Sequence, residues 1–224
     1  ARAAPALAPA RPTEARVVLV DKPGAPQTAL MVIDQGPVAG RPDAQALEVM
    51  NAALGGLFTS RINTQLREVK GYTYGVSSGF AQGRETGLFG LHGSVRSEVT
   101  GAALADMFKE FDAIRERALG TAELQRVRNA LLLSLPGQFD TNQAIADGYA
   151  RVWALGLPDE HIARLPAALT AVTAASAWKA ARDYLVPQRL IVVAVGDKAK
   201  VAPQLEAWGR KPVLQWPEPA RPGP

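Results

Sequence analysis

The sequence predicts an α+β fold in which helices pack on one face of a largely antiparallel β-sheet. Paired strand-like segments come first, a long helical stretch follows, and one strand returns near the C-terminal end. Hydrophobic residues make up 47% of the 224 residues and charged residues 21%, so the chain can bury a substantial core.

The strand-like segments are rich in β-branched and aromatic residues. They are residues 16–21, 27–34, 72–80, 87–95 and 189–195. The first ends at a turn formed by Pro23 and Gly24, and the third and fourth flank a polar loop, which predicts a hairpin. The last (RLIVVAV) is almost wholly apolar, as expected for a buried strand.

The helical segments are recognised by apolar spacing and by residues that favour helix ends. They are residues 43–54 and 60–69, the segments that follow Thr100 and Thr121, and residues 142–155, 174–185 and 199–208. Asp43 is the expected N-cap of the first, and Thr121 is expected to cap the helix that it begins.

The two ends of the chain differ in composition from the rest. Residues 1–15 are rich in Ala and Pro and predict a linker, and residues 212–224 form a Pro-rich tail, so we expect one domain over residues 16–211. The chain begins with Ala1, which we interpret as a processed protein or a piece of a longer one. Its composition favours the bacterial periplasm or cell envelope, with the cytoplasm as the alternative.

Composition excludes several classes of function. The chain has no cysteine, which rules out disulfides, thiolate zinc sites and a cysteine nucleophile. The net charge of +4 is not concentrated in any run of Lys and Arg, so no nucleic acid partner is expected. No stretch approaches the roughly 18 apolar residues of a membrane span. Neither a nucleophile-elbow motif nor a phosphate-binding glycine loop occurs.

The two histidines do not have the spacing of a zinc site, which takes about three protein ligands. His92 lies in a strand with no other ligand nearby, and we expect it to be exposed or half-buried. His161 ends the stretch LPDEH, which has a leucine where His-x-x-Glu-His has its first histidine. Pro158 within this stretch favours a turn, so we interpret His161 as solvated.

Residues 51–80 combine a Gly-Gly helix break, a short Arg-bearing helix and an aromatic strand. Arg61 and Arg67 need partners or solvent, because a guanidinium is costly to bury alone. Tyr74 lies seven residues after Arg67, across the turn at Gly71, so both side chains can reach one cleft. There a guanidinium and a phenol would donate hydrogen bonds to peptide carbonyls or to a developing oxyanion.

The same residues have a purely structural interpretation. Arg67 would then pair with Glu68 or Asp43, and Tyr74 would be a half-buried strand aromatic. The pattern alone leaves both interpretations open.

This segment resembles the C-terminal domain of the pitrilysin-type (M16, inverted zincin) zinc peptidases. The matching motifs are Leu54-Gly55-Gly56, Ser60-Arg61-Ile62, Leu66-Arg67-Glu68 and Gly71-Tyr72-Thr73-Tyr74. Weaker matches at residues 21–28, 154–158 and 195–197 extend the resemblance over about residues 14–210. It implies a LuxS/MPP-like metallohydrolase fold, in which residues 21–28 belong to a first hairpin.

In that family two homologous halves face each other, and one carries His-x-x-Glu-His and the zinc. The resemblance implies that Arg67 and Tyr74 are the catalytic substrate contacts of the other half, with Arg61, Gly75 and Ser77 as further substrate-binding residues. It implies no cofactor in this chain and zinc in a partner half, either fused upstream or a separate subunit. The implied substrate is an unfolded peptide held between the halves.

Three functions are therefore compared. The first is the non-catalytic, substrate-binding half of a zinc metalloendopeptidase, not active alone. The second is a catalytically silent scaffold subunit, and the third is a peptide-binding protein without catalysis. The presence of both Arg67 and Tyr74 favours the first, because a scaffold has no need of a guanidinium and a phenol aimed into a cleft.

Overall fold

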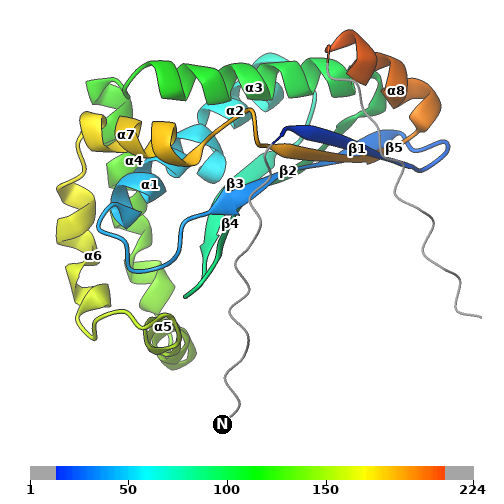
Figure 1. The fold of residues 1–224 in the computed structure, drawn as a ribbon. Coiled ribbons are helices and arrows are strands. Elements are labelled where there is room, and N and C mark those ends of the chain that lie inside the picture. Colours follow the sequence, from blue (N-terminus) through cyan, green and yellow to red (C-terminus); the bar gives the residue numbers. More distant parts are fainter. Residues whose placement is uncertain (1–13, 210–224) are drawn as a thin grey trace, which may run out of the picture.

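A computed structural model describes residues 14–209 and shows a curved sheet with helices on one face (Figure 1). The five strands are ordered β1-β5-β2-β4-β3. Their bounds are β1 Arg16–Asp21, β2 Gln27–Gly36, β3 Val76–Gln82, β4 Gly87–Arg96 and β5 Ile191–Gly196. The predicted α+β class is confirmed.

The helices form a layer on one face of the sheet and extend past its end (Figure 1). The α-helices are α1 Ala44–Asn51, α2 Arg61–Asn63, α3 Thr100–Glu116, α4 Thr121–Ser134, α5 Asn142–Leu155, α6 His161–Thr170, α7 Ala174–Tyr184 and α8 Lys198–Ala207. Two π-helical segments, η1 (Ala52–Gly56) and η2 (Thr64–Val69), continue α1 and α2. Short 3₁₀ turns lie at Ser97–Val99 and Pro136–Phe139.

The sheet is antiparallel except for the parallel pair β1 and β5. The expected first hairpin is wrong, because β5 lies between β1 and β2 and pairs with both. Because β5 has a neighbouring strand on each side, its backbone N–H and C=O groups can form hydrogen bonds at both edges. This position suits β5, which is the most apolar strand. The expected hairpin of β3 and β4 is confirmed.

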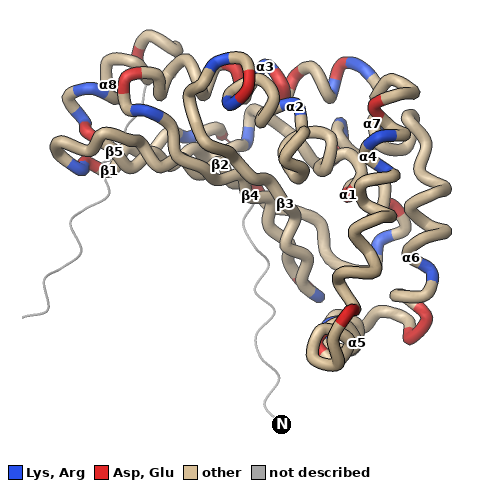
Figure 2. The backbone as a smooth tube through the Cα atoms, turned by 180° about the vertical axis from the view of Figure 1, so that it is seen from behind, with Lys and Arg blue, Asp and Glu red and all other residues tan. Residues whose placement is uncertain are grey.

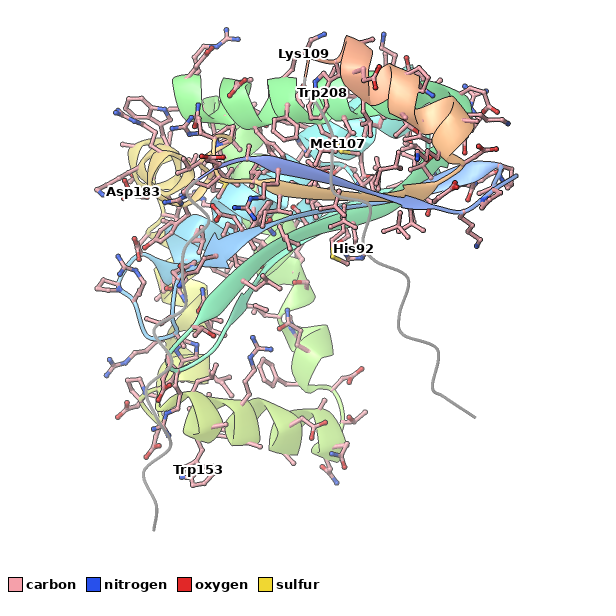
Figure 3. All side chains as sticks on the ribbon, turned by 45° about the vertical axis from the view of Figure 1, so that its right-hand side comes forward. His92, Met107, Lys109, Trp153, Asp183 and Trp208 are labelled. Carbon is pink, nitrogen blue, oxygen red and sulfur yellow. The ribbon has the colours of Figure 1, made fainter. Side chains whose placement is uncertain are left out.

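The core lies between the sheet and the helices. Leu30 and Val32 of β2 and Phe89 and Leu91 of β4 point into it and are fully or almost fully buried. The alternate residues of these strands point to the other side, as strand geometry requires. Figure 3 shows His92 on this second face, opposite Met107 and Trp208. None of the described helices covers that face (Figure 1), which we call the open face.

The residues before β3 depart from the prediction. The strand begins at Val76, not at Tyr72. The hydroxyl of Thr73 accepts a hydrogen bond from the Gly75 N–H at 3.0 Å and donates one to the Ser94 carbonyl at 2.6 Å. This local turn replaces ladder pairing, so Tyr74 and Gly75 precede the strand.

Asp43 is the N-cap of the first helix as expected, whereas the expected cap at Thr121 is wrong. Asp43 occupies the N-cap position of α1, but its carboxylate makes no capping hydrogen bond. It accepts instead from Arg41 Nε at 3.1 Å and from the Tyr184 hydroxyl at 2.8 Å. Thr121 is the first residue of α4, and Gly120 holds the N-cap position.

Helix α6 was not expected, because Pro158 and Pro166 interrupt the helical pattern. Pro158 lies in the turn that precedes α6, and the His161 N–H donates to its carbonyl at 2.9 Å. Pro166 lies inside the helix. The predicted linker, residues 1–15, and tail, residues 212–224, fall outside the described residues except for positions 14 and 15.

Charged residues are distributed mainly over the helices and loops (Figure 2). Acidic and basic residues are interspersed there, and most of the length of β2, β3 and β4 is uncharged. Across residues 14–209, no helix is both long enough and apolar enough to cross a membrane.

Candidate functional site

Two π-helical segments, η1 and η2, lie in the part of the chain that precedes β3, and Arg67 belongs to the second. Such segments are rare, and they often occur at functional sites because the extra residue per turn redirects side chains. Here η2 ends with the Lys70 N–H donating to the Gln65 carbonyl at 3.1 Å. The chain then turns at Gly71, whose φ of +62° favours glycine, and leads through Tyr74 into β3.

Two contacts hold the side chain of Arg67. Its Nη1 lies 2.8 Å from the Glu68 carboxylate, and its Cζ lies 3.9 Å from the centroid of the Phe58 ring. About a third of the side chain (32%) remains exposed. The predicted pairing with Glu68 is present and that with Asp43 is not. Because a guanidinium has five N–H donors, Arg67 retains donors for a ligand.

Tyr74 is the most exposed large hydrophobic side chain of the described residues, at 89%. It is therefore not the half-buried strand aromatic of the structural interpretation. Within residues 14–209 its hydroxyl makes no hydrogen bond, including none with Arg67. Both side chains reach the surface of this domain, and neither lines the cavity beside Arg61 or the cavity beside Leu88.

Asn63, which none of the sequence motifs singles out, fixes the start of β3. Its Nδ2 donates to the Val76 carbonyl at 2.8 Å, and the Val76 N–H donates to its Oδ1 at 2.8 Å. The same Nδ2 contacts the Leu57 carbonyl at 3.1 Å. The signal in the sequence was an amide between Ile62 and Leu66, on the buried side of a short helix. Asn63 thereby links the two parts of the chain that carry Arg67 and Tyr74.

Arg61 is engaged within the domain. Its Nε and Nη2 each lie 2.7 Å from a carboxylate oxygen of Glu123, so the pair ties α2 to α4. This hydrogen bonding lowers the pKa of Glu123 below its ordinary value, against the opposing effect of burial. Arg61 also lines a cavity of about 600 Å³ together with Glu110 and Arg126. A substrate contact by Arg61 stays a prediction, and it would compete with Glu123.

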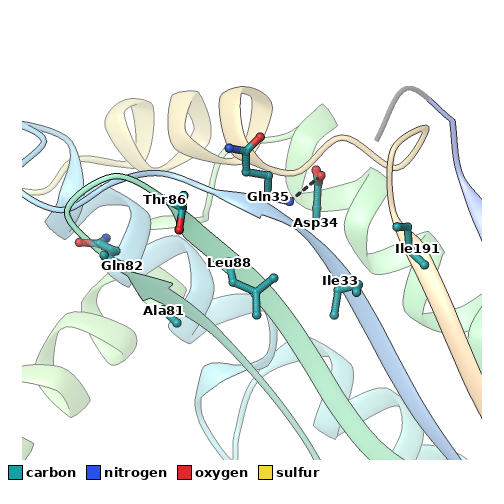
Figure 4. Close-up of a pocket in the computed structure, with 10 residues that line it drawn as sticks. Ile33, Asp34, Gln35, Ala81, Gln82, Thr86, Leu88 and Ile191 are labelled. Carbon is teal, nitrogen blue, oxygen red and sulfur yellow. Dashed lines mark hydrogen bonds between the residues drawn. The ribbon is translucent and has the colours of Figure 1, made fainter. Parts of the chain in front are cut away.

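The open face of the sheet carries Ser77, another of the predicted substrate contacts. Ser77 is exposed and lies opposite His92 in the ladder. Farther along, a shallow cavity of about 550 Å³ lies over the end of β2, β3 and β4 (Figure 4). Apolar side chains form much of its lining, with amides beside them: Ile33, Gln35, Ala81, Gln82, Leu88 and Ile191. Such a surface suits an apolar side chain with a neighbouring peptide group.

The histidines and carboxylates of residues 14–209 do not form a zinc site. His92 lies on the open face, and His161 begins α6, where burial lowers its pKa. Between residues 14 and 209, no group of three or more His, Cys, Asp or Glu side chains is placed to hold a metal ion. The donors present here do not fit the ligand set of a catalytic zinc.

Comparison with known proteins gives one family and several similar folds. The family model of the peptidase M16 inactive domain matches residues 2–131. No curated protein sequence matches the chain significantly. The peptidase M16 inactive domain from Pseudomonas fluorescens is similar with a TM-score of 0.77 and 24% identity, over 84% of this chain and 44% of that one.

Two further solved structures share the fold. A chain of complex III2 from Candida albicans is similar with a TM-score of 0.71 and 11% identity, over 88% of this chain and 49% of that one. The inactive peptidase domain of a proposed zinc protease from Bordetella parapertussis has a TM-score of 0.66 and 16% identity, over 76% of this chain and 93% of that one.

The chain thus spans less than half the length of the Pseudomonas and Candida chains. At these sequence identities the structural likeness establishes the fold alone. The family model, in contrast, covers more than half of the chain and includes every motif between Leu54 and Tyr74. The chain therefore belongs to the M16 peptidase family, as an inactive domain.

Proposed function

We propose that this domain is the non-catalytic, substrate-binding half of an M16 zinc metalloendopeptidase, whose partner half carries zinc and His-x-x-Glu-His. One observation carries the proposal: Arg67 keeps N–H donors to spare beside Glu68 and Phe58, and Tyr74, whose hydroxyl has no hydrogen-bond partner among residues 14–209, lies between the turn at Gly71 and β3. Packing and stability within this domain do not explain why Arg67 keeps spare donors or why Tyr74 presents its hydroxyl to solvent.

The proposed chemistry is stabilisation of negative charge. Attack on a peptide carbonyl moves charge onto its oxygen, and donors fixed beside that oxygen lower the barrier. Arg67 would donate to the oxyanion or to the adjacent carbonyl, and Tyr74 would donate its hydroxyl to the substrate backbone. Zinc in the partner half would supply Lewis-acid chemistry at the same carbonyl.

The hydrogen bonds already formed along the free edge of β3 limit where a peptide substrate can bind. An extended peptide often joins an exposed sheet edge as an extra strand. Along β3, however, Asn63 already pairs with the backbone of Val76, and Asn51 Nδ2 donates to the Ser78 carbonyl at 3.0 Å. These contacts support a path over the open face, past Ser77, in place of strand addition at this part of the edge.

The test is a peptidase assay on an unfolded peptide, combined with metal analysis. It compares this chain alone, a His-x-x-Glu-His half alone, and the two combined or fused. We expect activity to depend on the combination and zinc to follow the partner half. Cleavage or stoichiometric zinc with this chain alone would contradict the proposal.

A catalytically silent scaffold is the second candidate. The similarity to a chain of complex III2 from Candida albicans favours it, because that protein is part of a large assembly. The same assay separates the two functions. A pair that assembles and binds zinc but never cleaves any peptide would favour the scaffold.

A further inference from the structure

The ring beneath Arg67 belongs to Phe58, a residue to which neither the sequence motifs nor the proposed function gives a role. The guanidinium carbon of Arg67 lies 3.9 Å from the ring centroid, well within the range of a cation–π contact. Phe58 nevertheless remains 63% exposed, so it adds little to the core. A single exposed aromatic residue is ordinary on a protein surface, but one stacked under a candidate catalytic guanidinium is a specific arrangement.

The backbone on both sides of Phe58 is held by side chains from other elements. The carbonyl of Leu57 accepts a hydrogen bond from Asn63 at 3.1 Å. The carbonyl and the hydroxyl of Thr59 both accept from Nη1 of Arg126 in α4, each at 3.1 Å. The loop is therefore anchored on both sides of Phe58, which fixes the backbone position from which the ring projects.

Arg67 itself has no comparable anchor. Its ion-pair partner, Glu68, is the next residue and is 60% exposed, so the pair restrains the guanidinium weakly. Phe58 is the one aromatic ring among the described residues that contacts Arg67. A planar guanidinium stacked on a ring keeps its edge donors free, whereas a carboxylate occupies them.

From this geometry we infer that Phe58 is a positioning residue for Arg67: its ring orients the guanidinium so that the free donors face the peptide carbonyl. The inference rests on the proposed function, because it assigns Phe58 a role through Arg67. The ring touches no reacting atom, so its loss should lower kcat and leave KM nearly unchanged. An exposed cation–π contact corresponds to a factor of about two to five in rate.

The test uses this domain assembled with its His-x-x-Glu-His half, cleaving an unfolded peptide. Phe58→Leu keeps an apolar side chain but removes the aromatic face, and Phe58→Trp keeps a face. Val69→Ala is the control, because Val69 of η2 is apolar and about as exposed as Phe58 but has no aromatic face to offer Arg67. We expect kcat to fall about two- to fivefold in Phe58→Leu and to stay near wild type in Phe58→Trp and Val69→Ala.

A double-mutant cycle with Arg67→Ala decides how Phe58 acts. If Phe58 works through Arg67, Phe58→Leu should cause no further loss in the Arg67→Ala background. An equal loss in both backgrounds overturns the inference, because Phe58 would then act on its own. A neutral Phe58→Leu beside a damaging Arg67→Ala overturns it too, but leaves the proposed function standing.

If Arg67→Ala is itself neutral, the proposed function and the inference fail together. Nuclear magnetic resonance of the domain separates the stacking from the kinetics. The ring should shift the Arg67 side-chain resonances upfield in wild type and Phe58→Trp but not in Phe58→Leu. Absence of this shift in wild type would remove the structural basis of the inference.

Discussion

Arg61 and Arg67 lie six residues apart, but their guanidinium groups differ in what they already contact. Arg61 gives two short hydrogen bonds to Glu123, and both side chains of that pair are largely buried. Arg67 gives one hydrogen bond to an exposed neighbour and rests on an exposed ring. The first arrangement stabilises a helix contact, and the second leaves donors for a ligand.

Substitution should separate these two roles. In the complex with the catalytic half, Arg67→Ala should lower kcat by about ten- to a thousandfold, by analogy with a lost oxyanion donor. The unfolding free energy of the Arg67→Ala domain and the zinc content of the complex should stay near wild type. The comparison variant Arg61→Ala should instead cost about 1–3 kcal/mol of unfolding free energy, because Glu123 loses its partner. Urea denaturation measures the unfolding free energy of each variant, and peptidase kinetics measure its kcat. Undiminished activity of Arg67→Ala would show that Arg67 does not contact the transition state.

At the scale of single residues, the sequence indicates which residues are candidates for the site better than it indicates what their side chains contact. Motif and spacing single out Arg67 and Tyr74 as candidates, and the pairing of Arg67 with Glu68 is one of the stated alternatives. Phe58 was not found, because Leu57 and Phe58 together look like the start of a buried segment. The partner of Arg61 was not found either, since Glu123 lies 62 residues away and no local pattern links them.

Among the elements, β3 depends on a side chain for its alignment with the helical segment. Asn63 supplies both an acceptor and a donor to Val76, in place of a neighbouring strand. The side chain is almost fully buried, so water cannot replace these hydrogen bonds.

Asn63→Ala should therefore destabilise the domain. The change leaves a buried N–H and a buried carbonyl without partners, which costs about 2–4 kcal/mol in total. Equilibrium urea denaturation should show this loss, whereas Asn142→Ala, at the exposed start of α5, should differ little from wild type. If Asn63→Ala unfolds at the same urea concentration as wild type, Asn63 does not fix the start of β3.

Helix α7 is tied to the start of α1 by Tyr184, Asp43 and Arg41. Burial and the hydrogen bond to Asp43 raise the pKa of Tyr184 to about 12. Burial also raises the pKa of Asp43, but hydrogen bonds from Tyr184 and Arg41 outweigh it and leave that pKa below its ordinary value of 3.8. The folded state thus prefers a neutral Tyr184 and an ionised Asp43.

Stability should depend on pH accordingly. The contribution of Tyr184 is complete below its ordinary pKa of 10 and is lost as pH rises towards about 12. The contribution of Asp43 is present above 3.8 and is lost as pH falls through its lowered folded pKa. Thermal unfolding of Tyr184→Phe should show a smaller decline between pH 10 and 12 than wild type. Tyr149→Phe, which removes an exposed ring hydroxyl, should keep the wild-type profile, and identical profiles for all three would exclude this linkage.

The elements also show what local pattern cannot supply. Strand type and most boundaries followed from alternation and turn residues, and α5 was predicted with its observed bounds. The π-helical character of η1 and η2 was not predicted, because segments of 5 and 6 residues span little more than one turn and are too short for apolar spacing to reveal the wider turn. The insertion of β5 between β1 and β2 joins residues more than 150 positions apart, and periodicity carries no information on such pairing.

The whole molecule is a sheet with one face packed and one face open. The chain covers less than half of the Pseudomonas and Candida chains that it resembles, and the function proposed above pairs it with a catalytic M16 half. The open face could contact such a partner directly, or it could line a water-filled space in which a peptide binds. The proposed function requires the second arrangement.

The three methionines of the chain can distinguish these arrangements. Met31 lies on the open face and is 49% exposed, whereas Met50 and Met107 are fully buried in the core. Mild peroxide should therefore oxidise Met31 at least about tenfold faster than the other two, because sulfoxide formation follows exposure. Peptide mapping by mass spectrometry measures all three rates in one sample, and the buried pair reports any unfolding.

Oxidation of Met31 should then be followed in the assembled complex. If the open face lines a chamber, the catalytic half alone should leave Met31 reactive, since peroxide is small enough to enter. An unfolded peptide that resists cleavage should slow Met31 oxidation, because it would lie over β2 and β4. Protection by the catalytic half without any peptide would instead show that the open face is a contact surface. In that case Ser77 and the cavity over Leu88 and Ile33 would be buried between the halves, and the peptide would have to reach Arg67 by another path.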